Sequence, residues 1–326
     1  MNLSWQLFCK RAKLIEDQKG IALILVLVVI ALLVSLVVDF SYTMRVDLTL
    51  AANLRDEIKA LYTARSGTEV ARLMLKEDDP VYDSLDEDWA QFTEHPGFIS
   101  QDDEGRFKGT IEDEASKMAI NELVTEAGEV DEDRLKQLTR LFQLLELDLD
   151  LIDPILDWLD SDDRPRPLGA EDEYYQGLSP PYPCKDSPLS AVEELLLVKG
   201  MTEDIFYGDE EKKGLVHYLT TFSEGKVNIN TAPSLVLQTL SDSIDEGLAQ
   251  ALIDYRQEEP FKTIEEVNNV PGVTAEIYSE INPVITVQSS TFSLRVEGQV
   301  RGIKKGIFMV LNRQGEEVRP IFWRAE

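Results

Sequence analysis

An uncharged apolar stretch near the N-terminus limits what this chain can fold into. It runs from Ile21 to Val38, "IALILVLVVIALLVSLVV", and holds eighteen residues without a charge. At 1.5 Å per residue, a helix of this length is roughly 27 Å long, close to the thickness of a bilayer's hydrocarbon core. The sequence therefore predicts a transmembrane helix at residues 21–38.

The charges on either side of this stretch predict which way it crosses the membrane. Asp39 follows it directly. Four basic residues precede it: Lys10, Arg11, Lys13 and Lys19. Because basic flanks remain on the cytoplasmic side, we expect a cytoplasmic N-terminus, a single pass and an exported C-terminal body.

The exported body is strongly acidic. Residues 21–326 contain 28 basic and 59 acidic residues, a side-chain balance of -31. Such a charge repels nucleic acid and anionic membrane surfaces, and it attracts cations. The composition therefore predicts no nucleic-acid partner.

The two cysteines are far apart, and only Cys184 lies in the exported body, since Cys9 precedes the apolar stretch. No intramolecular disulfide can therefore stabilise that body. A buried apolar role and an intermolecular thiol both remain open for Cys184.

A small residue directly before the apolar stretch distinguishes this N-terminus from an ordinary secretory signal. Secretory signals have a shorter apolar core with the cleavage site after it, whereas here Gly20 stands between Lys19 and Ile21. This arrangement resembles the prepilin leader of type IV pilins and type II secretion pseudopilins, which a membrane peptidase cuts after the glycine. The resemblance implies a removed leader at residues 1–20 and N-methylation of Ile21. An uncleaved signal anchor would have the same residues.

The residues after the apolar stretch predict that its helix continues. From Asp39 to Lys76 there is no proline and one glycine, Gly67. Apolar residues recur mainly at three- and four-residue steps: Val46, Leu50, Leu54, Ile58, Leu61, Val70 and Leu73. We therefore expect one long amphipathic helix, like a pilin stem, in place of the flexible linker common in tethered enzymes.

The fifth residue of the expected mature chain departs from most pilin-like subunits. They carry a glutamate there that neutralises the amino terminus of a neighbour, whereas counting from Ile21 leads to Leu25. An unpaired charge in the bilayer costs at least ~2.5 kcal/mol. Leu25 therefore favours insertion but lacks this assembly contact, which is typical of the K-type minor pseudopilins.

The strand patterns predict an α+β fold with a small antiparallel sheet. "DDEGRFKGTIEDEASKMAIN" predicts a strand pair that ends at Asn121, in a region of stem helix and first strands at residues 39–121. "TFSLRVEGQV" and "KKGIFMVLNR" predict a hairpin around "RGI", and "PIFWRA" a last strand, all within residues 287–326. Packed on the stem helix, these strands would form a pilin-like head.

A mostly helical insertion, residues 122–286, is expected between these strands. "DEDRLKQLTRLFQLLEL" predicts a helix with Asp131 as its N-cap. "DPILDWLDSDD" predicts a second helix that starts at Pro154, since proline suits a first helical turn.

The insertion contains an internal repeat with an offset of 72 residues. "PLSAVEELLLVKGMTEDIF" from Pro188 aligns without gaps with "PFKTIEEVNNVPGVTAEIY" from Pro260. Each copy predicts a helix, a glycine-centred turn and a second helix capped by threonine, so we expect two related helical modules.

Three segments of the insertion carry a resemblance to one family. They are "DWLDSDDRPRPLGAEDEYYQGLSPPY", "PLSAVEELLLVKGM" and "VNINTAPSLVL", in that order. Together with the leader and Leu25, they are similar to the K-type minor pseudopilins of type II secretion systems, the general secretion pathway protein K family. The resemblance implies an inner-membrane subunit with its body in the periplasm, at the tip of the pseudopilus, where it initiates or caps the fibre. It also implies prepilin peptidase as the processing enzyme and I-type and J-type minor pseudopilins as partners. A minor pilin of a type IV pilus is the nearest alternative, against which the large insertion argues.

The repeated modules also resemble helix-hairpin-helix units, which bind DNA phosphates through backbone N–H groups. The second copy offers Lys262 as its nearby base. Six glutamates surround it: Glu258, Glu259, Glu265, Glu266, Glu276 and Glu280. A membrane-anchored DNA-binding protein is therefore a weaker alternative.

Motifs of catalysis are missing from the sequence. It has no P-loop, no G-x-S-x-G and no H-E-x-x-H, and neither His95 nor His217 lies near a cysteine in sequence. We therefore expect no enzymatic activity, with a tethered periplasmic hydrolase as the competing class.

An acidic loop in the insertion is the candidate metal site. Its oxygen donors lie within sixteen residues: Asp157, Asp160, Asp162, Asp163, Glu171 and Asp172. Such hard donors suit calcium, although Arg164 at the fifth position excludes an EF-hand. The family resemblance also implies calcium. We take Asp160, Asp162, Asp163, Glu171 and Asp172 as candidate ligands, and the sequence leaves open which of them converge.

Overall fold

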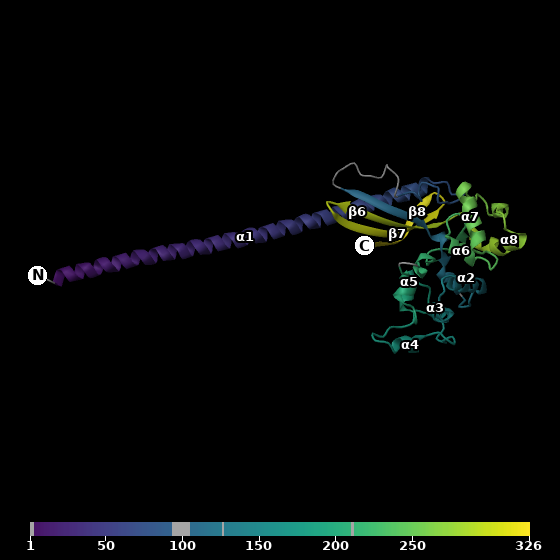
Figure 1. Ribbon diagram of the computed structural model, residues 1–326, viewed down its shortest axis with the longest axis horizontal. Coiled ribbons are helices and arrows are strands. Elements are labelled where there is room, and N and C mark those ends of the chain that lie inside the picture. The colour runs from purple at the N-terminus through teal and green to yellow at the C-terminus, as the bar shows by residue number, and fades with distance from the viewer. Residues whose placement is uncertain (1–2, 93–104, 126, 210–211) are drawn as a thin grey trace. The chain divides into compact units, whose positions relative to one another are not determined.

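The computed structural model describes residues 3–92, 105–125, 127–209 and 212–326, with side chains from residue 20 onward. The chain divides into two units, residues 1–59 and 60–326. Helix α1, Leu3–Glu77, makes up the described part of the first unit and continues into the second (Figure 1). The predicted continuation of the transmembrane helix as a long helix is therefore confirmed.

In the first unit, the apolar stretch has no protein partner among the described residues. Every residue from Gly20 to Leu50 is exposed, and none of the apolar window is buried. In a bilayer, lipid would cover these side chains, and the helix satisfies its own backbone hydrogen bonds. The stretch is therefore compatible with a single-pass inner-membrane anchor.

The second unit contains the predicted antiparallel sheet, with strand order β1-β6-β7-β8. Its strands are β1 Arg106–Asp113, β6 Thr291–Val300, β7 Ile303–Gln314 and β8 Glu317–Ala325. Arg301 and Gly302 join β6 to β7, and both have positive φ angles, 48° and 89°. A two-residue loop of this kind matches the twist of a hairpin, so the hairpin around "RGI" is confirmed.

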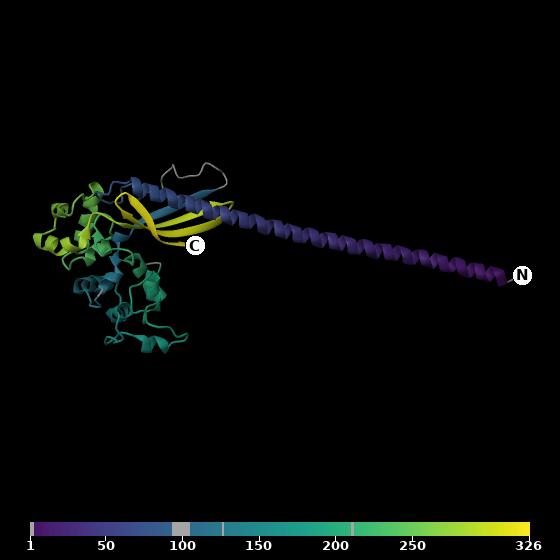
Figure 2. The same ribbon diagram turned by 180° about the vertical axis from the view of Figure 1, so that it is seen from behind.

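The sheet packs on the part of α1 that belongs to the second unit (Figure 2). Ala64, Ala71 and Leu75 of α1 form a buried core with sheet residues that include Phe292 and Leu294. The contact is close because Gly298 has no side chain: a Cβ there would lie 2.2 Å from the carbonyl oxygen of Ala60. The α+β head with a small sheet on a stem helix is confirmed.

The predicted strand pair before Asn121 is wrong in its second half. β1 is present, but a 3-10 turn, Glu114–Ser116, follows it, and β2, Met118–Ala119, pairs in parallel with β3, Leu219–Thr220. The Asp113 carboxylate accepts the N–H of Ala115 at 2.8 Å and caps this turn. The chain therefore leaves the sheet here, and β1 pairs with the distant β6.

The insertion forms a block of short helices beside the sheet, with the larger hydrophobic core of this unit (Figure 1). The α-helices are α2 Glu132–Leu144, α3 Ile152–Leu159, α4 Asp172–Gln176, α5 Glu203–Tyr207, α6 Ser234–Thr239, α7 Glu246–Glu258 and α8 Ala275–Ile281. The 3-10 helices are η2 Glu114–Ser116, η3 Ile120–Leu123, η4 Leu149–Leu151, η5 Val192–Leu197, η6 Leu215–His217, η7 Ile264–Asn269 and η8 Asn282–Val284. Two short strands, β4 Val227–Asn228 and β5 Ile285–Thr286, pair in parallel.

The predicted start of α2 is confirmed, whereas that of α3 is shifted. Asp131 accepts the N–H groups of Asp133 and Arg134, each at 3.0 Å. Helix α3 begins at Ile152 rather than at Pro154, because the turn η4 before it already has helical backbone and runs into α3. Pro154 still lies in the first turn, where its missing N–H costs nothing.

The two repeated modules have the predicted turns and caps. Gly200 and Gly272 have φ angles of 84° and 100°, which favour glycine. Thr202 and Thr274 each accept an N–H three residues later, at 3.3 Å, and start α5 and α8. The first element of each module is a 3-10 helix, η5 or η7, rather than the expected α-helix.

Candidate functional site

The acidic loop after α3 gathers three of the five predicted metal ligands. Carboxylate oxygens of Asp160, Asp162 and Glu171 all lie within 4.8 Å of one another, and we call these residues the loop cluster. Asp160 and Glu171 are buried, each 4% exposed, whereas Asp162 is exposed. The cluster therefore opens to solvent at Asp162, where an ion could enter.

The other two predicted ligands lie outside the loop cluster. Asp163 is exposed. Asp172 begins α4, and its Oδ1 accepts the backbone N–H of Cys184 at 2.7 Å. Asp172 therefore holds the chain segment around Cys184 against the acidic loop.

Asp157 organises the loop through Arg166 and is fully buried. The Arg166 Nη1 lies 2.6 Å from Asp157 Oδ1 and also contacts Asp160. Burial raises the pKa of Asp157, while its hydrogen bonds to Arg166 oppose that change. Gly169 gives the carboxylate its space, because a Cβ there would lie 1.7 Å from Asp157 Oδ2.

Glu171 is the buried carboxylate that this arrangement leaves uncompensated. Both of its carboxylate oxygens are buried, and neither receives a hydrogen bond from a described residue. Burial, followed by the negative charge of Asp157, raises the pKa of Glu171 to about 7. Because a buried carboxylate without donors is destabilising, a bound cation would relieve the cost. The oxygen donors of the loop cluster therefore fit calcium.

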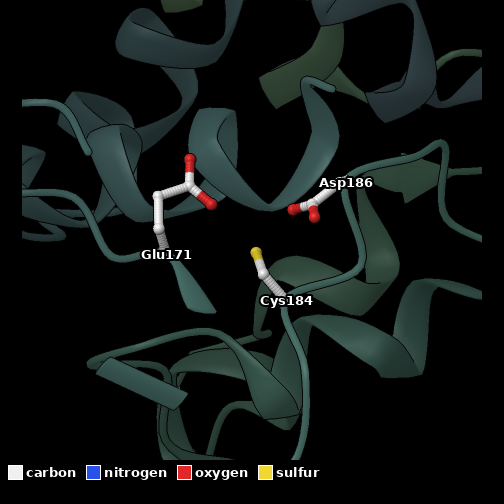
Figure 3. A group of neighbouring side chains, drawn as sticks. All are labelled: Glu171, Cys184 and Asp186. Carbon is white, nitrogen blue, oxygen red and sulfur yellow. The ribbon is translucent and has the colours of Figure 1, made fainter. Parts of the chain in front are cut away.

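Cys184 and Asp186 also lie at this site, although sequence patterns did not identify them as ligands. The Cys184 sulfur and oxygens of Glu171 and Asp186 lie within 4.8 Å of one another. The sulfur points into the space between the two carboxylates (Figure 3). Both residues lie beyond Tyr182 in an irregular, proline-containing segment, where no periodicity predicts which side chains turn inward.

A second group of acidic residues, Asp78, Asp83 and Glu87, lies where α1 ends; we call it the junction cluster. Arg313 of β7 compensates it: its Nη1 is 2.8 Å from Asp78, and its Nη2 contacts Asp83. Burial raises the pKa of Asp83 to about 6 and that of Glu87 to about 7. The neighbouring Asp113 carboxylate is also buried but satisfied.

The donors around Asp113 come from the interior of the insertion and from the segment just after it. Its Oδ2 accepts from Asn228 at 3.0 Å, Thr231 at 2.5 Å and Ser289 at 2.7 Å. Ser289 in turn donates its N–H to Asp83 at 2.7 Å. The junction is therefore a structural network that holds the insertion to the sheet and the end of α1.

Comparison with protein families matches two segments of the chain. Residues 116–207 and 227–288 both match models described as "Type II secretion system (T2SS), protein K". The chain belongs to the type II secretion system protein K family. The first match contains the whole acidic loop with Cys184 and Asp186, and the second contains the module that starts at Pro260.

Relatives in the protein K family have low identity over long alignments. Type II secretion system protein K of Aeromonas hydrophila is 25% identical in an alignment 305 residues long that covers 87% of this chain and 89% of the relative. The Klebsiella pneumoniae protein is 28% identical in an alignment 227 residues long that covers 66% of each chain. A chain in the crystal structure of the GspK-GspI-GspJ complex from enterotoxigenic Escherichia coli has a TM-score of 0.69 at 19% identity. That match covers 85% of this chain and 99% of the other, and it shows the same fold.

The predicted processing residues lie outside both protein K matches. A Cβ at Gly20 would meet no atom within 4 Å, and Ile21 and Leu25 are 63% and 61% exposed. All three lie within α1. Cleavage after Gly20, methylation of Ile21 and the assembly role of Leu25 stay predictions.

Proposed function

We propose that this protein is a minor pseudopilin at the tip of the periplasmic pseudopilus of a type II secretion system, where it initiates or caps the fibre. The observation that carries this proposal is the insertion: 165 residues with their own core interrupt the sheet between β1 and β6. So large a block beside the sheet would obstruct a further head stacked above it. The first position in the fibre avoids that obstruction.

The N-terminal segment supplies the means of assembly in this proposal. Prepilin peptidase cleaves after Gly20, Ile21 becomes the methylated N-terminus, and residues 21–38 cross the inner membrane with the body in the periplasm. Leu25 carries no carboxylate to neutralise the amino terminus of another subunit. A first subunit needs no such contact with a subunit ahead of it.

The exported half of the first unit offers a surface for partner helices. Val46, Leu50, Leu54 and Ile58 recur every four residues along one side of α1 and are 40–60% exposed. The related solved chain was crystallised with GspI and GspJ. We propose that I-type and J-type minor pseudopilins pack against this row.

A bound calcium ion would stabilise the insertion at the loop cluster. Asp160, Asp162 and Glu171 would hold the ion, since Asp163 and Asp172 lie outside the group. Calcium would supply the positive charge that the buried Glu171 oxygens lack, while Asp157 and Arg166 keep the loop in shape.

Tip placement can be tested by labelling the insertion in assembled fibres. A gold label on an exposed cysteine introduced by Glu173→Cys, in a cysteine-free background, should lie at one fibre end. Labels distributed along the fibre, or normal fibres and secretion in cells that lack this protein, would contradict the proposal.

The partner surface can be tested with two aspartate substitutions at equally exposed leucines. Leu54→Asp should reduce co-purification of the I-type and J-type subunits at least tenfold. Leu48 is 61% exposed but lies outside the apolar row, so Leu48→Asp should preserve capture. Equal effects of the two substitutions would argue against the row as the partner surface.

A further inference from the structure

An exposed apolar patch surrounds Lys199 in the insertion. Leu168, Tyr174 and Leu197 are 46%, 42% and 45% exposed. The Lys199 Nζ donates to the carbonyl oxygen of Leu168 at 3.0 Å and lies 5.3 Å from the centre of the Tyr174 ring. The hydroxyl of the half-buried Tyr182 donates to the carbonyl oxygen of Leu197 at 2.8 Å. We call Leu168, Tyr174, Tyr182 and Leu197 the Lys199 patch. Figure 1 shows α4, which carries Tyr174, at the edge of the insertion away from the sheet.

Buried aromatic rings hold the Lys199 patch in place. Tyr175 is fully buried, and the centre of its ring lies 5.2 Å from that of Tyr174 and 5.5 Å from that of Tyr182. Its hydroxyl accepts the backbone N–H of Lys199 at 3.2 Å. A surface that is already fixed in shape loses little conformational entropy on binding, and aromatic side chains are enriched in protein–protein interfaces. The patch therefore suits a protein partner.

The surroundings of the Lys199 patch are acidic, which limits what can bind there. Residues 157–199 contain 10 acidic and 4 basic residues, a side-chain balance of -6. Asp162, Asp163 and Glu173 are exposed in this region. The negative charge repels the same face of a second copy, nucleic acid and an anionic membrane, whereas it attracts a basic partner. The two positive charges of calcium at the loop cluster would not reverse its sign.

We propose that the Lys199 patch docks a basic segment of another protein. Apolar side chains of that segment pack on Leu168, Tyr174 and Leu197, and its lysines and arginines face the surrounding carboxylates. The charge of Lys199 itself is partly compensated, because the carbonyl oxygens of Leu168 and Gly169 accept hydrogen bonds from its ammonium group. The inference rests on this surface alone and does not depend on the proposed position at the fibre tip.

Selection from a displayed library of random peptides tests the proposal without assuming a sequence. The full-length protein is held in nanodiscs of phosphatidylcholine, which has no net charge, at a constant calcium concentration. The double variant Tyr174→Ser/Leu197→Ser, which keeps the charge of the parent protein, removes peptides that bind outside the patch. The remaining peptides should combine lysine or arginine with leucine or aromatic residues and should carry a net positive charge.

Matched substitutions separate binding at the patch from general attraction to an acidic protein. For a selected peptide, Leu197→Ser should raise the dissociation constant at least ~10-fold. Leu85 is 54% exposed but lies outside the patch, so Leu85→Ser should change the constant less than twofold. Glu173→Lys, next to Tyr174, should weaken binding several-fold, whereas Glu317→Lys on β8 should not. Raising the salt concentration from about 0.05 M to about 0.3 M should weaken binding, because salt screens exposed charges.

Three results would overturn the proposal. One is a selection that yields acidic or uncharged peptides, or none beyond those that the double variant also binds. Another is an equal loss of affinity in Leu197→Ser and Leu85→Ser. The third is binding to phosphatidylglycerol vesicles, or a doubled mass of the protein, that Leu197→Ser abolishes, since this would assign the patch to a membrane or to a second copy. The substituted side chains are exposed, so each variant should keep the melting temperature of the parent protein, which controls for misfolding.

Discussion

The junction cluster and the loop cluster both collect buried carboxylates, but the chain compensates them differently. At the junction, Arg313 reaches two of the three acidic residues. In the acidic loop, Arg166 compensates Asp157 and Asp160 but leaves both oxygens of Glu171 without a donor among the described residues. Arg313 therefore compensates the negative charge of Asp78 and Asp83 in the junction cluster. In the loop cluster, the charge of Glu171 is left for an ion from solution to compensate.

The regions that supply the two clusters also differ in net charge. The insertion, residues 122–286, has 36 acidic and 12 basic residues, a side-chain balance of -24. Residues 287–326, which contain the last three strands, have 4 acidic and 7 basic residues, a balance of +3. Arg313, from the basic C-terminal strands, compensates Asp78 and Asp83, while the net negative charge of the insertion favours cations from outside.

Removing the internal base of the junction should have the largest effect. Arg313→Ala leaves Asp83 buried without its cation, which should lower the free energy of unfolding by about 3–5 kcal/mol. Chemical denaturation would measure this loss. Arg319, on the neighbouring strand, is exposed and pairs with the exposed Glu317, so Arg319→Ala should cost no more than ~1 kcal/mol. Equal losses of unfolding free energy in Arg313→Ala and Arg319→Ala would mean that Arg313 does not stabilise the buried carboxylates of the junction.

Removing the calcium ion that we propose at the loop cluster should have the next largest effect. At a calcium concentration of 100 times the dissociation constant, binding stabilises a protein by about 2.7 kcal/mol, and chelation should remove this amount. In Glu171→Gln most of the calcium-dependent rise in melting temperature should disappear. Asp163→Asn should retain it, because Asp163 lies outside the loop cluster. A melting temperature indifferent to calcium would reject the ion at this cluster.

The pH dependence of the junction should give a smaller effect. Asp83 and Glu87 have pKa values raised to about 6 and about 7, so the folded state binds more protons than the unfolded state above pH 4. Stability should therefore fall as pH rises from about 4 to about 7, by on the order of 1 kcal/mol for Glu87 after allowance for its exposure. Calcium-saturated Glu87→Gln should show a flatter profile than the parent protein. If stability depends on pH with the same slope in Glu87→Gln and in the parent protein, Glu87 does not contribute to this pH dependence.

Local features of the fold could be predicted from the sequence because neighbouring residues determine them. The length of α1 follows from the lack of proline, and the hairpin follows from Arg301 and Gly302. The partner of β1 could not be predicted, because β6 follows the whole insertion. The second expected strand does not pair with β1, because a turn capped by Asp113 leads the chain out of the sheet and β2 pairs with β3.

The candidate site was predicted only in part for a related reason. Composition identified the acidic loop, and Asp160, Asp162 and Glu171 do converge. Composition could not show that Asp172 holds the backbone of Cys184. The approach of Cys184 and Asp186 to Glu171 depends on tertiary packing, for which the sequence has no periodic signal.

The most direct test of the central claim, that this chain is a processed pseudopilin, is the N-terminal mass of the protein recovered from membranes. It should be measured in cells with and without a prepilin peptidase. We predict a chain that begins at N-methylated Ile21 when the peptidase is present, and an uncleaved leader when it is absent. A chain that still begins at Met1 or Asn2 in both cases would contradict the claim and identify residues 21–38 as a plain signal anchor.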